Sequence, residues 1–317
     1  MKNCFLRVAL ALAFFGAWLP TASAFEVVIR RNIEYVVHDN IKLRGDLYRP
    51  RELRSAPVLV AVHGGAWQEG TPAFYRHWGP YLASRGYAVF AVHYRLAQAG
   101  KPSYPAAVYD IRSAVQFVRA KASSLNVDPE RIGLMGDDAG AQLATLVALA
   151  GAEPQFSKEY RNDPNAATPV DVKAAAVFYG IFDMQAQWTH DQIFRPRDQI
   201  AEKFLGVSPM QSRQKYFEAS PIGYATADKN KPWINVIYGT SDEVVDAGTQ
   251  SLSFLTALKQ AQFIVQKIEI PNVGHYWVSD PFTDPGSPNE YIGPRLLRFL
   301  GDAFATDREK ESPAESQ

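Results

Sequence analysis

The sequence has 317 residues, of which 47% are hydrophobic and 21% are charged, with 33 basic and 33 acidic side chains. This composition is typical of one soluble globular domain that is large enough to bury a substantial core. A formal net charge of +0 gives no electrostatic reason to expect nucleic acid or an anionic membrane surface as a partner.

The first 24 residues have the organisation of a secretory signal peptide. Lys2 and Arg7 are positively charged, residues 8–19 are apolar, and residues 22–24 are small enough for a cleavage site. The apolar run is shorter than the roughly 20 residues that a membrane span needs. We therefore expect cleavage before Phe25, no stable membrane insertion of the mature chain, and a periplasmic or secreted location.

Cysteine usage excludes several kinds of chemistry. The only cysteine, Cys4, lies in the segment that we expect to be removed. A mature chain without a thiol has no disulfide, no zinc–thiolate site and no cysteine nucleophile. No other motif implies a metal or an organic cofactor.

Apolar segments of strand length alternate with segments of helical spacing along the rest of the chain. We predict a hairpin over 33–50 and strands over 57–62, 87–94, 131–136, 172–179, 233–238 and 263–270, with helices over 73–84, 105–123 and 291–304. Nearly apolar strands that alternate with helices indicate an α/β fold, in which a mostly parallel sheet carries helices on both faces. The domain is expected to span 25–306, and the polar tail 307–317 to be disordered.

One segment, about 184–230, does not fit this alternation. It carries five large aromatic side chains among many polar ones, namely Trp188, Phe194, Phe204, Tyr216 and Phe217. Because it falls between two predicted strands, we expect it to lie at their carboxyl ends and to cover the site as a short lid. A peripheral insertion that covers apolar surface without touching substrate is the alternative.

The segment 131–144 has the form of a nucleophile elbow, a tight turn that joins a buried strand to a helix. Gly136 and Gly140 would let strand and helix approach closely, and the helix N-terminus supplies backbone N–H groups to an anion. In the motif G-x-S-x-G the central residue is serine, but here it is Asp138. The pattern predicts the fold and leaves the reaction open.

Two later strands are followed by residues that could complete a centre at Asp138. Asp242 comes after the strand 233–238, and His275 lies in the loop after the strand 263–270. This gives the chain order elbow residue, acid, histidine. We interpret His275 as the general base and acid, and Asp242 as the carboxylate that orients its imidazole.

The loop His63-Gly64-Gly65-Ala66-Trp67 follows another buried strand. Its backbone can direct N–H groups towards a developing oxyanion, so we assign Gly64, Gly65 and Ala66, together with Ala139, to an oxyanion hole. The side chain of His63 is expected to support this loop. The remaining histidines show no ligand-like spacing and are interpreted as ordinary surface or packing residues: His38, His77, His93 and His190.

Taken together, these motifs resemble the α/β-hydrolase fold, and within it the bacterial esterase/lipase and arylformamidase-like group with an H-G-G-x-W oxyanion loop. The matching stretches are Asp46–Pro50, 63–67, Tyr94–Leu96, 137–144 and the surroundings of Asp242 and His275. The resemblance covers about residues 35–304. It implies hydrolysis of a small, neutral ester or amide-like substrate without a cofactor, with Asp242 and His275 as acid and histidine. The serine of that group has no counterpart here.

Three hypotheses follow for Asp138. It could take part in carbonyl chemistry with His275, by positioning water or acting as a base. It could instead attack an sp³ carbon, as in the dehalogenases and epoxide hydrolases that share this fold, and form an ester that His275 helps to hydrolyse. Third, it could be a stabilised carboxylate in a non-catalytic binding protein. Neither the substrate's identity nor the oligomeric state can be predicted from these patterns.

Overall fold

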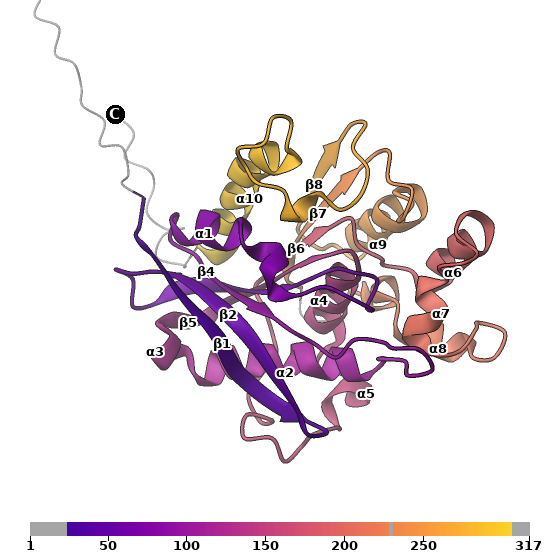
Figure 1. The fold of residues 1–317 in the computed structure, drawn as a ribbon, viewed down its shortest axis with the longest axis horizontal. Helices are drawn as coiled ribbons and strands as arrows, with labels where there is room; N and C mark the ends of the chain where they lie inside the picture. The colour runs from indigo at the N-terminus through magenta and orange to yellow at the C-terminus, as the bar shows by residue number, and fades with distance from the viewer. Residues whose placement is uncertain (1–23, 228–230, 306–317) are drawn as a thin grey trace, which may run out of the picture.

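A computed structural model describes residues 24–227 and 231–305 of the chain (Figure 1). The expected signal peptide, including Cys4, and the tail 307–317 lie outside these ranges apart from residue 24.

Eight strands form one sheet in the order β1-β2-β4-β3-β5-β6-β7-β8. They are β1 (Val27–His38), β2 (Ile41–Pro50), β3 (Ala56–Val62), β4 (Ala88–Val92), β5 (Val127–Asp137), β6 (Ala174–Phe178), β7 (Trp233–Gly239) and β8 (Val265–Ile270). The pairs β1–β2 and β2–β4 are antiparallel, and all other neighbours are parallel. The predicted α/β fold with a mostly parallel sheet is confirmed.

Helices cover both faces of this sheet (Figure 1). They are α1 (Trp78–Ala83), α2 (Ala106–Ala120), α3 (Ala122–Leu125), α4 (Asp138–Ala150), α5 (Pro154–Ser157), α6 (Met184–Phe194), α7 (Ile200–Leu205), α8 (Arg213–Glu218), α9 (Ser253–Gln260) and α10 (Pro288–Phe304). Side chains of α2, α4 and α9 belong to one apolar cluster, and those of α1 and α10 to another. The two clusters lie on opposite faces of the sheet.

The apolar spacing predicted for α2 is confirmed, since Val108, Ile111, Val115 and Val118 are all fully buried. Each such side chain contributes roughly 1.5–3 kcal/mol when it leaves water. This packing fixes α2 on the sheet beside α4, the helix that begins at the elbow.

Several elements differ from the prediction, among them β1, which begins at Val27, and β5, which begins at Val127. The helix expected over 73–84 consists of a 3₁₀ turn, Pro72–Tyr75, followed by α1. A continuous helix would bring the ring of Pro80 against the carbonyl of Arg76, four residues earlier, which explains the break. The helix α9 was not predicted from the sequence.

The glycines of the elbow are required by close backbone contacts. A Cβ atom on Gly140 would lie 2.0 Å from the carbonyl oxygen of Val62, and one on Gly136 would lie 2.4 Å from the carbonyl oxygen of Gly140. Asp138 itself has φ of 48°, a left-handed conformation that costs free energy in a residue with a side chain. The tight strand-to-helix turn expected here is therefore present.

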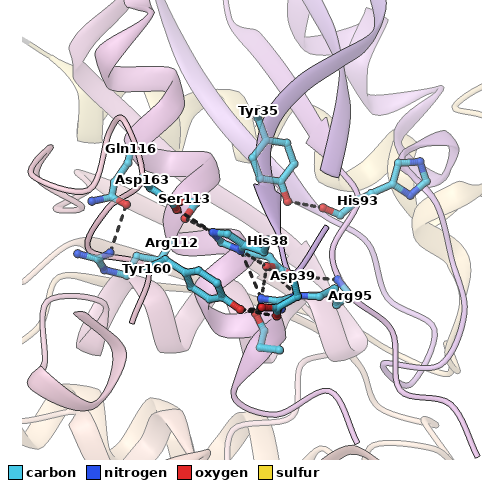
Figure 2. Close-up of polar contacts among 12 residues, drawn as sticks. Tyr35, His38, Asp39, His93, Arg95, Arg112, Ser113, Gln116, Tyr160 and Asp163 are labelled. Carbon is cyan, nitrogen blue, oxygen red and sulfur yellow. Dashed lines mark hydrogen bonds and ion pairs between the residues drawn. The ribbon is translucent and has the colours of Figure 1, made fainter. Parts of the chain in front are cut away.

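Far from the elbow in sequence, a buried cluster of charged side chains joins β1 to α2 and to the loop that precedes β6 (Figure 2). The ring of His38 is fully buried, with Nδ1 at 2.7 Å from Asp110 Oδ1 and Nε2 at 2.8 Å from Asp163 Oδ2. A neutral imidazole has only one N–H, so both contacts are hydrogen bonds only when His38 is protonated. The structure thus corrects the interpretation of His38 as an ordinary side chain.

Arg95 completes this cluster. Its guanidinium Nε and Nη2 donate to Asp110 at 2.9 Å and 2.7 Å, and its Nη1 donates to the hydroxyl of Tyr160 at 2.9 Å. The ring of Tyr160 stacks on His38 with centroids 3.8 Å apart. Together these contacts bind the loop after α5 to the hairpin of β1 and β2.

No helix within residues 24–227 and 231–305 is both long enough and apolar enough to cross a membrane.

Candidate active site

The structure brings Asp138, Asp242 and His275 together at the carboxyl ends of three parallel strands. Asp138 begins α4 directly after β5, Asp242 follows β7, and His275 follows β8. His275 Nδ1 lies 2.6 Å from Asp242 Oδ2, and His275 Nε2 lies 3.7 Å from Asp138 Oδ1. All three side chains are at most 4% exposed. The histidine therefore lies between two buried carboxylates.

The carboxylate of Asp138 occupies the oxyanion hole predicted from the sequence. Its Oδ2 accepts hydrogen bonds from the backbone N–H groups of Gly65, at 2.9 Å, and Ala66, at 2.8 Å. Burial raises the pKa of Asp138. The opposite effect of His275 and of the N–H groups of Ala66 and Ala139 is larger, so the pKa lies below its usual range. The N–H groups of Gly65 and Ala66 thus bind a carboxylate of the protein itself.

The imidazole of His275 carries a proton at neutral pH. Burial of the ring lowers its pKa, but Asp138 and Asp242 outweigh burial and raise the pKa to about 9. Asp242 is itself fixed, because its Oδ1 accepts the backbone N–H groups of Val244 and Val245, each at 2.9 Å. A protonated histidine cannot act as a general base.

The two atoms that face each other across this centre, Asp138 Oδ1 and His275 Nε2, are buried and have no hydrogen-bond partner within the part of the chain that the structure describes. Buried polar atoms without partners are costly and uncommon in folded proteins. At a separation of 3.7 Å, a small polar group that contacts both atoms would satisfy them. Reacting atoms are expected at this position.

Asp137, the neighbour of Asp138, is a further buried acid that the sequence reasoning did not single out. Its Oδ1 accepts the backbone N–H of Gly64 at 3.0 Å and contacts the hydroxyl of Tyr75 at 2.8 Å. Burial and the charge of Asp138 raise the pKa of Asp137 to about 7. The Gly64 N–H therefore binds Asp137, which corrects the assignment of Gly64 to the oxyanion hole, while the N–H groups of Gly65 and Ala66 point to Asp138. The sequence signal for Asp137 was the presence of a second acidic side chain, next to Asp138, at the end of a buried strand.

The loop His63–Trp67 is held from several sides. The Nδ1 of His63 contacts the carbonyl of Gly64 at 2.7 Å, and burial lowers the pKa of His63 to about 4, so its ring is neutral. Tyr94 donates a hydrogen bond to the carbonyl of His63 at 3.0 Å. Trp67 donates to Gln142 of α4 at 3.0 Å. These contacts agree with a supporting role for His63.

A pocket of about 1080 Å³ is lined by residues that follow two members of the centre in sequence, namely Tyr276 after His275 and Glu243 and Val244 after Asp242, whereas Asp138, Asp242 and His275 themselves do not line it. Its wall includes Ile193 and Phe194 of α6 and Tyr276, whose side chains are 64%, 69% and 63% exposed. The ring of Tyr276 contacts that of His275 edge to face, with centroids 4.4 Å apart. Helix α6 belongs to the segment 184–230, so part of this segment lines a pocket together with Tyr276, the neighbour of His275.

Within residues 24–227 and 231–305, no group of three or more histidine, cysteine, aspartate or glutamate side chains is arranged to hold a metal ion.

Comparison with known proteins places the chain among esterase-like sequences. The family model described as BD-FAE matches residues 45–258. The probable carboxylic ester hydrolase LipM of Mycobacterium tuberculosis is 27% identical over 84% of this chain and 60% of its own length. The isoprenylcysteine alpha-carbonyl methylesterase ICME of Arabidopsis thaliana is 30% identical over 74% of this chain and 53% of its own length. The chain thus spans little more than half the length of these relatives.

Solved structures share the fold. The esterase Est2 of Thermogutta terrifontis, with butyrate bound, superposes with a TM-score of 0.67 at 22% identity, over 93% of this chain and 97% of that one. A truncated carbohydrate esterase from gut microbiota superposes with a TM-score of 0.70 at 20% identity, over 90% of this chain and 99% of that one. At these identities, the likeness concerns the fold alone.

Proposed function

Because the chain belongs to the BD-FAE family, within the α/β-hydrolase fold, we propose that it hydrolyses a carboxylic ester at a centre formed by Asp138, Asp242 and His275. The observation that carries this proposal is the position of His275 between the two carboxylates. The esterase names of the relatives support the reaction class. The predicted signal peptide supports action outside the cytoplasm.

A water molecule is the attacking group in this proposal. The water would contact both Asp138 Oδ1 and His275 Nε2, which are 3.7 Å apart. It would lose a proton to neutral His275 while its oxygen bonds to the ester carbonyl carbon. The C–O bond to the alcohol then breaks, and the alcohol takes the proton from His275. Because Asp138 Oδ2 already holds the N–H groups of Gly65 and Ala66, the substrate oxyanion receives little stabilisation, and the reaction is expected to be slow.

The apolar pocket beside Tyr276 supports an ester with a bulky apolar group. Aromatic and aliphatic side chains that are exposed in a pocket gain free energy when a ligand removes them from water. Ile193, Phe194 and Tyr276 offer such a surface, and the ring of Tyr276 contacts that of His275. An ester with one apolar substituent fits this environment.

The test is hydrolysis of a p-nitrophenyl butyrate ester at pH 9, where a substantial fraction of His275 is neutral. We expect slow turnover by the wild-type protein and a loss of roughly tenfold or more in the His275→Ala variant, because the base is removed. Thermal unfolding checks that this variant is folded. Equal rates for the wild type and His275→Ala would contradict ester hydrolysis at this centre.

A second function, attack of Asp138 on an sp³ carbon, is favoured by one specific observation. Asp138 Oδ2 lies in the oxyanion hole while Oδ1 is unpartnered and faces His275. Oδ1 would bond to the carbon as the leaving group departs with its electron pair. The resulting aspartyl ester is neutral, which removes one cause of the raised pKa of His275 and frees the imidazole to activate water. Water would then lose a proton to His275 and attack Cγ, which breaks the bond between Cγ and Oδ1, releases the alcohol that takes up this proton, and regenerates the carboxylate with one oxygen from water.

Isotope transfer separates these two routes. A single turnover of an alkyl halide or epoxide substrate in heavy-oxygen water is expected to leave ¹⁸O in the side chain of Asp138, as seen by mass spectrometry of the elbow peptide. Ester hydrolysis by direct water attack puts the label in the product acid and leaves Asp138 unlabelled. Turnover of the halide or epoxide with unlabelled Asp138 would exclude the nucleophilic route.

A further inference from the structure

A second cavity, of about 500 Å³, lies next to the oxyanion loop. Its wall includes Gln68, the residue after Trp67, together with the turn over residues 97–102 and residues from 197 to 206. The amide of Gln68 donates to the carbonyl of Ala66 at 3.3 Å, which connects the cavity wall to the loop that holds Asp138. The cavity wall is thus connected to this loop, although Asp138, Asp242 and His275 do not line the cavity.

Three cationic side chains line this cavity: Lys101, Arg197 and Lys203. Across residues 24–227 and 231–305, none of the three forms an ion pair with a carboxylate. The one acid in the lining, Glu202, accepts a hydrogen bond from Trp188 Nε1 at 3.0 Å. Unpaired cations that share a cavity repel one another, and an anionic ligand relieves this repulsion.

The walls of the cavity are fixed to one another by packing between α7 and the loop after β4. The ring of Phe204 stacks on Trp67 with centroids 4.3 Å apart, and the Phe204 carbonyl accepts the N–H of Tyr104 at 3.2 Å. Pro102 lies so close to Gly206 that a Cβ there would be 2.6 Å from its ring. The cations are therefore carried by a platform with defined geometry, which lowers the cost of ordering them around a ligand.

The segment 195–199 separates this cavity from the apolar pocket. Arg195 lines the apolar pocket, whereas Arg197 and Gln199 line the cation-lined cavity. The apolar pocket and the cation-lined cavity thus lie on either side of the segment 195–199. A substrate that uses both would carry an apolar group at one end and a polar, anionic group at the other.

We propose that the cavity beside Gln68 binds the carboxylate of a sugar acid, as the polar part of the substrate. Lys101, Arg197 and Lys203 would neutralise the carboxylate, and the amides of Gln68, Gln98 and Gln199 suit the hydroxyl groups of a sugar. The volume of about 500 Å³ fits one sugar ring. The role of this cavity in turnover rests on the proposed ester hydrolysis, but binding itself does not.

Calorimetric titration of the full chain with D-glucuronate at low salt tests the site, with D-glucose and inorganic phosphate as comparison ligands. We expect glucuronate to bind and glucose not to bind at the same concentrations. Changing Lys101→Gln, Arg197→Gln and Lys203→Gln together is expected to weaken glucuronate binding about tenfold, since three exposed ion pairs are lost. The matched control carries Arg54→Gln, Lys121→Gln and Lys259→Gln, which removes the same charge elsewhere and should leave binding unchanged.

Equal affinity of the wild type and the cavity variant for glucuronate would overturn the proposal, as would binding of glucose as tight as that of glucuronate. Tighter binding of phosphate than of glucuronate would overturn the assignment of a carboxylate. These titrations contain no ester. Glucuronate binding by a protein that fails to hydrolyse esters would therefore refute the proposed function and leave the cavity assignment standing.

Discussion

Replacing Asp138 by serine is expected to raise the rate of ester hydrolysis by roughly 10³-fold or more. The change removes the carboxylate oxygen that accepts the N–H groups of Gly65 and Ala66, and it supplies a hydroxyl nucleophile next to His275. The oxyanion hole would become available to the substrate. The measurement is the initial rate on p-nitrophenyl butyrate for both proteins, compared at matched concentrations of folded protein.

The pH profile gives a second readout of the same substitution. Asp138 is one of the two carboxylates that raise the pKa of His275 to about 9, so the wild-type rate should increase from neutral pH towards pH 9. Without that carboxylate the pKa of His275 falls, and the half-maximal rate of Asp138→Ser should occur at a lower pH. The control is Asp138→Ala, which loses the charge without gaining a nucleophile. A serine variant no faster than the alanine variant would refute the expected gain.

Replacing His38 by alanine is expected to lower the free energy of unfolding by about 3–5 kcal/mol, because the buried Asp110 and the half-buried Asp163 lose their shared partner. Asp110 would retain Arg95, but Asp163 would lose its contact with Nε2 of the ring. Urea unfolding at pH 6 measures the change. His77→Ala is the control, since that half-buried ring accepts a hydrogen bond from its neighbour Arg76 and, unlike His38, forms no ion pair with a carboxylate among the described residues.

The contribution of His38 should depend on pH in a defined direction. Burial lowers the pKa of His38, but the hydrogen bonds to Asp110 and Asp163 raise it above the value of about 6.5 in an unfolded chain. The stabilisation is therefore complete below about pH 6.5 and is lost as the pH rises through the raised pKa. Arg95, Asp39, Tyr160 and Ser113 also face the ring. A difference between wild type and His38→Ala that stays constant up to pH 10 would contradict this assignment.

The fold could be predicted from the sequence because each signal was local. Buried strands read as apolar runs, the spacing in α2 marks its buried face, and the glycines of the elbow report a close contact of backbone atoms. The proximity of Asp138, Asp242 and His275 follows from the parallel sheet, since the carboxyl ends of its strands meet at one edge.

The occupation of the oxyanion hole and the cluster at His38 could not be predicted in this way. Which oxygen of Asp138 meets the N–H groups of Gly65 depends on a side-chain rotamer and on the φ of 48° at the elbow. His38, Asp110 and Asp163 lie in three separate segments, and nothing in the spacing of 72 and 125 residues indicates contact. Both features arise from tertiary packing rather than from local pattern.

The stacking of Phe204 on Trp67 bears on how molecules reach the centre. Helix α7 is attached through this ring to the loop that carries Gly65 and Ala66, and through its carbonyl to Tyr104. A displacement of α7 would therefore also displace the backbone N–H groups that face Asp138. Ligand entry that required α7 to move would therefore also disturb the hydrogen bonds that Asp138 accepts from Gly65 and Ala66.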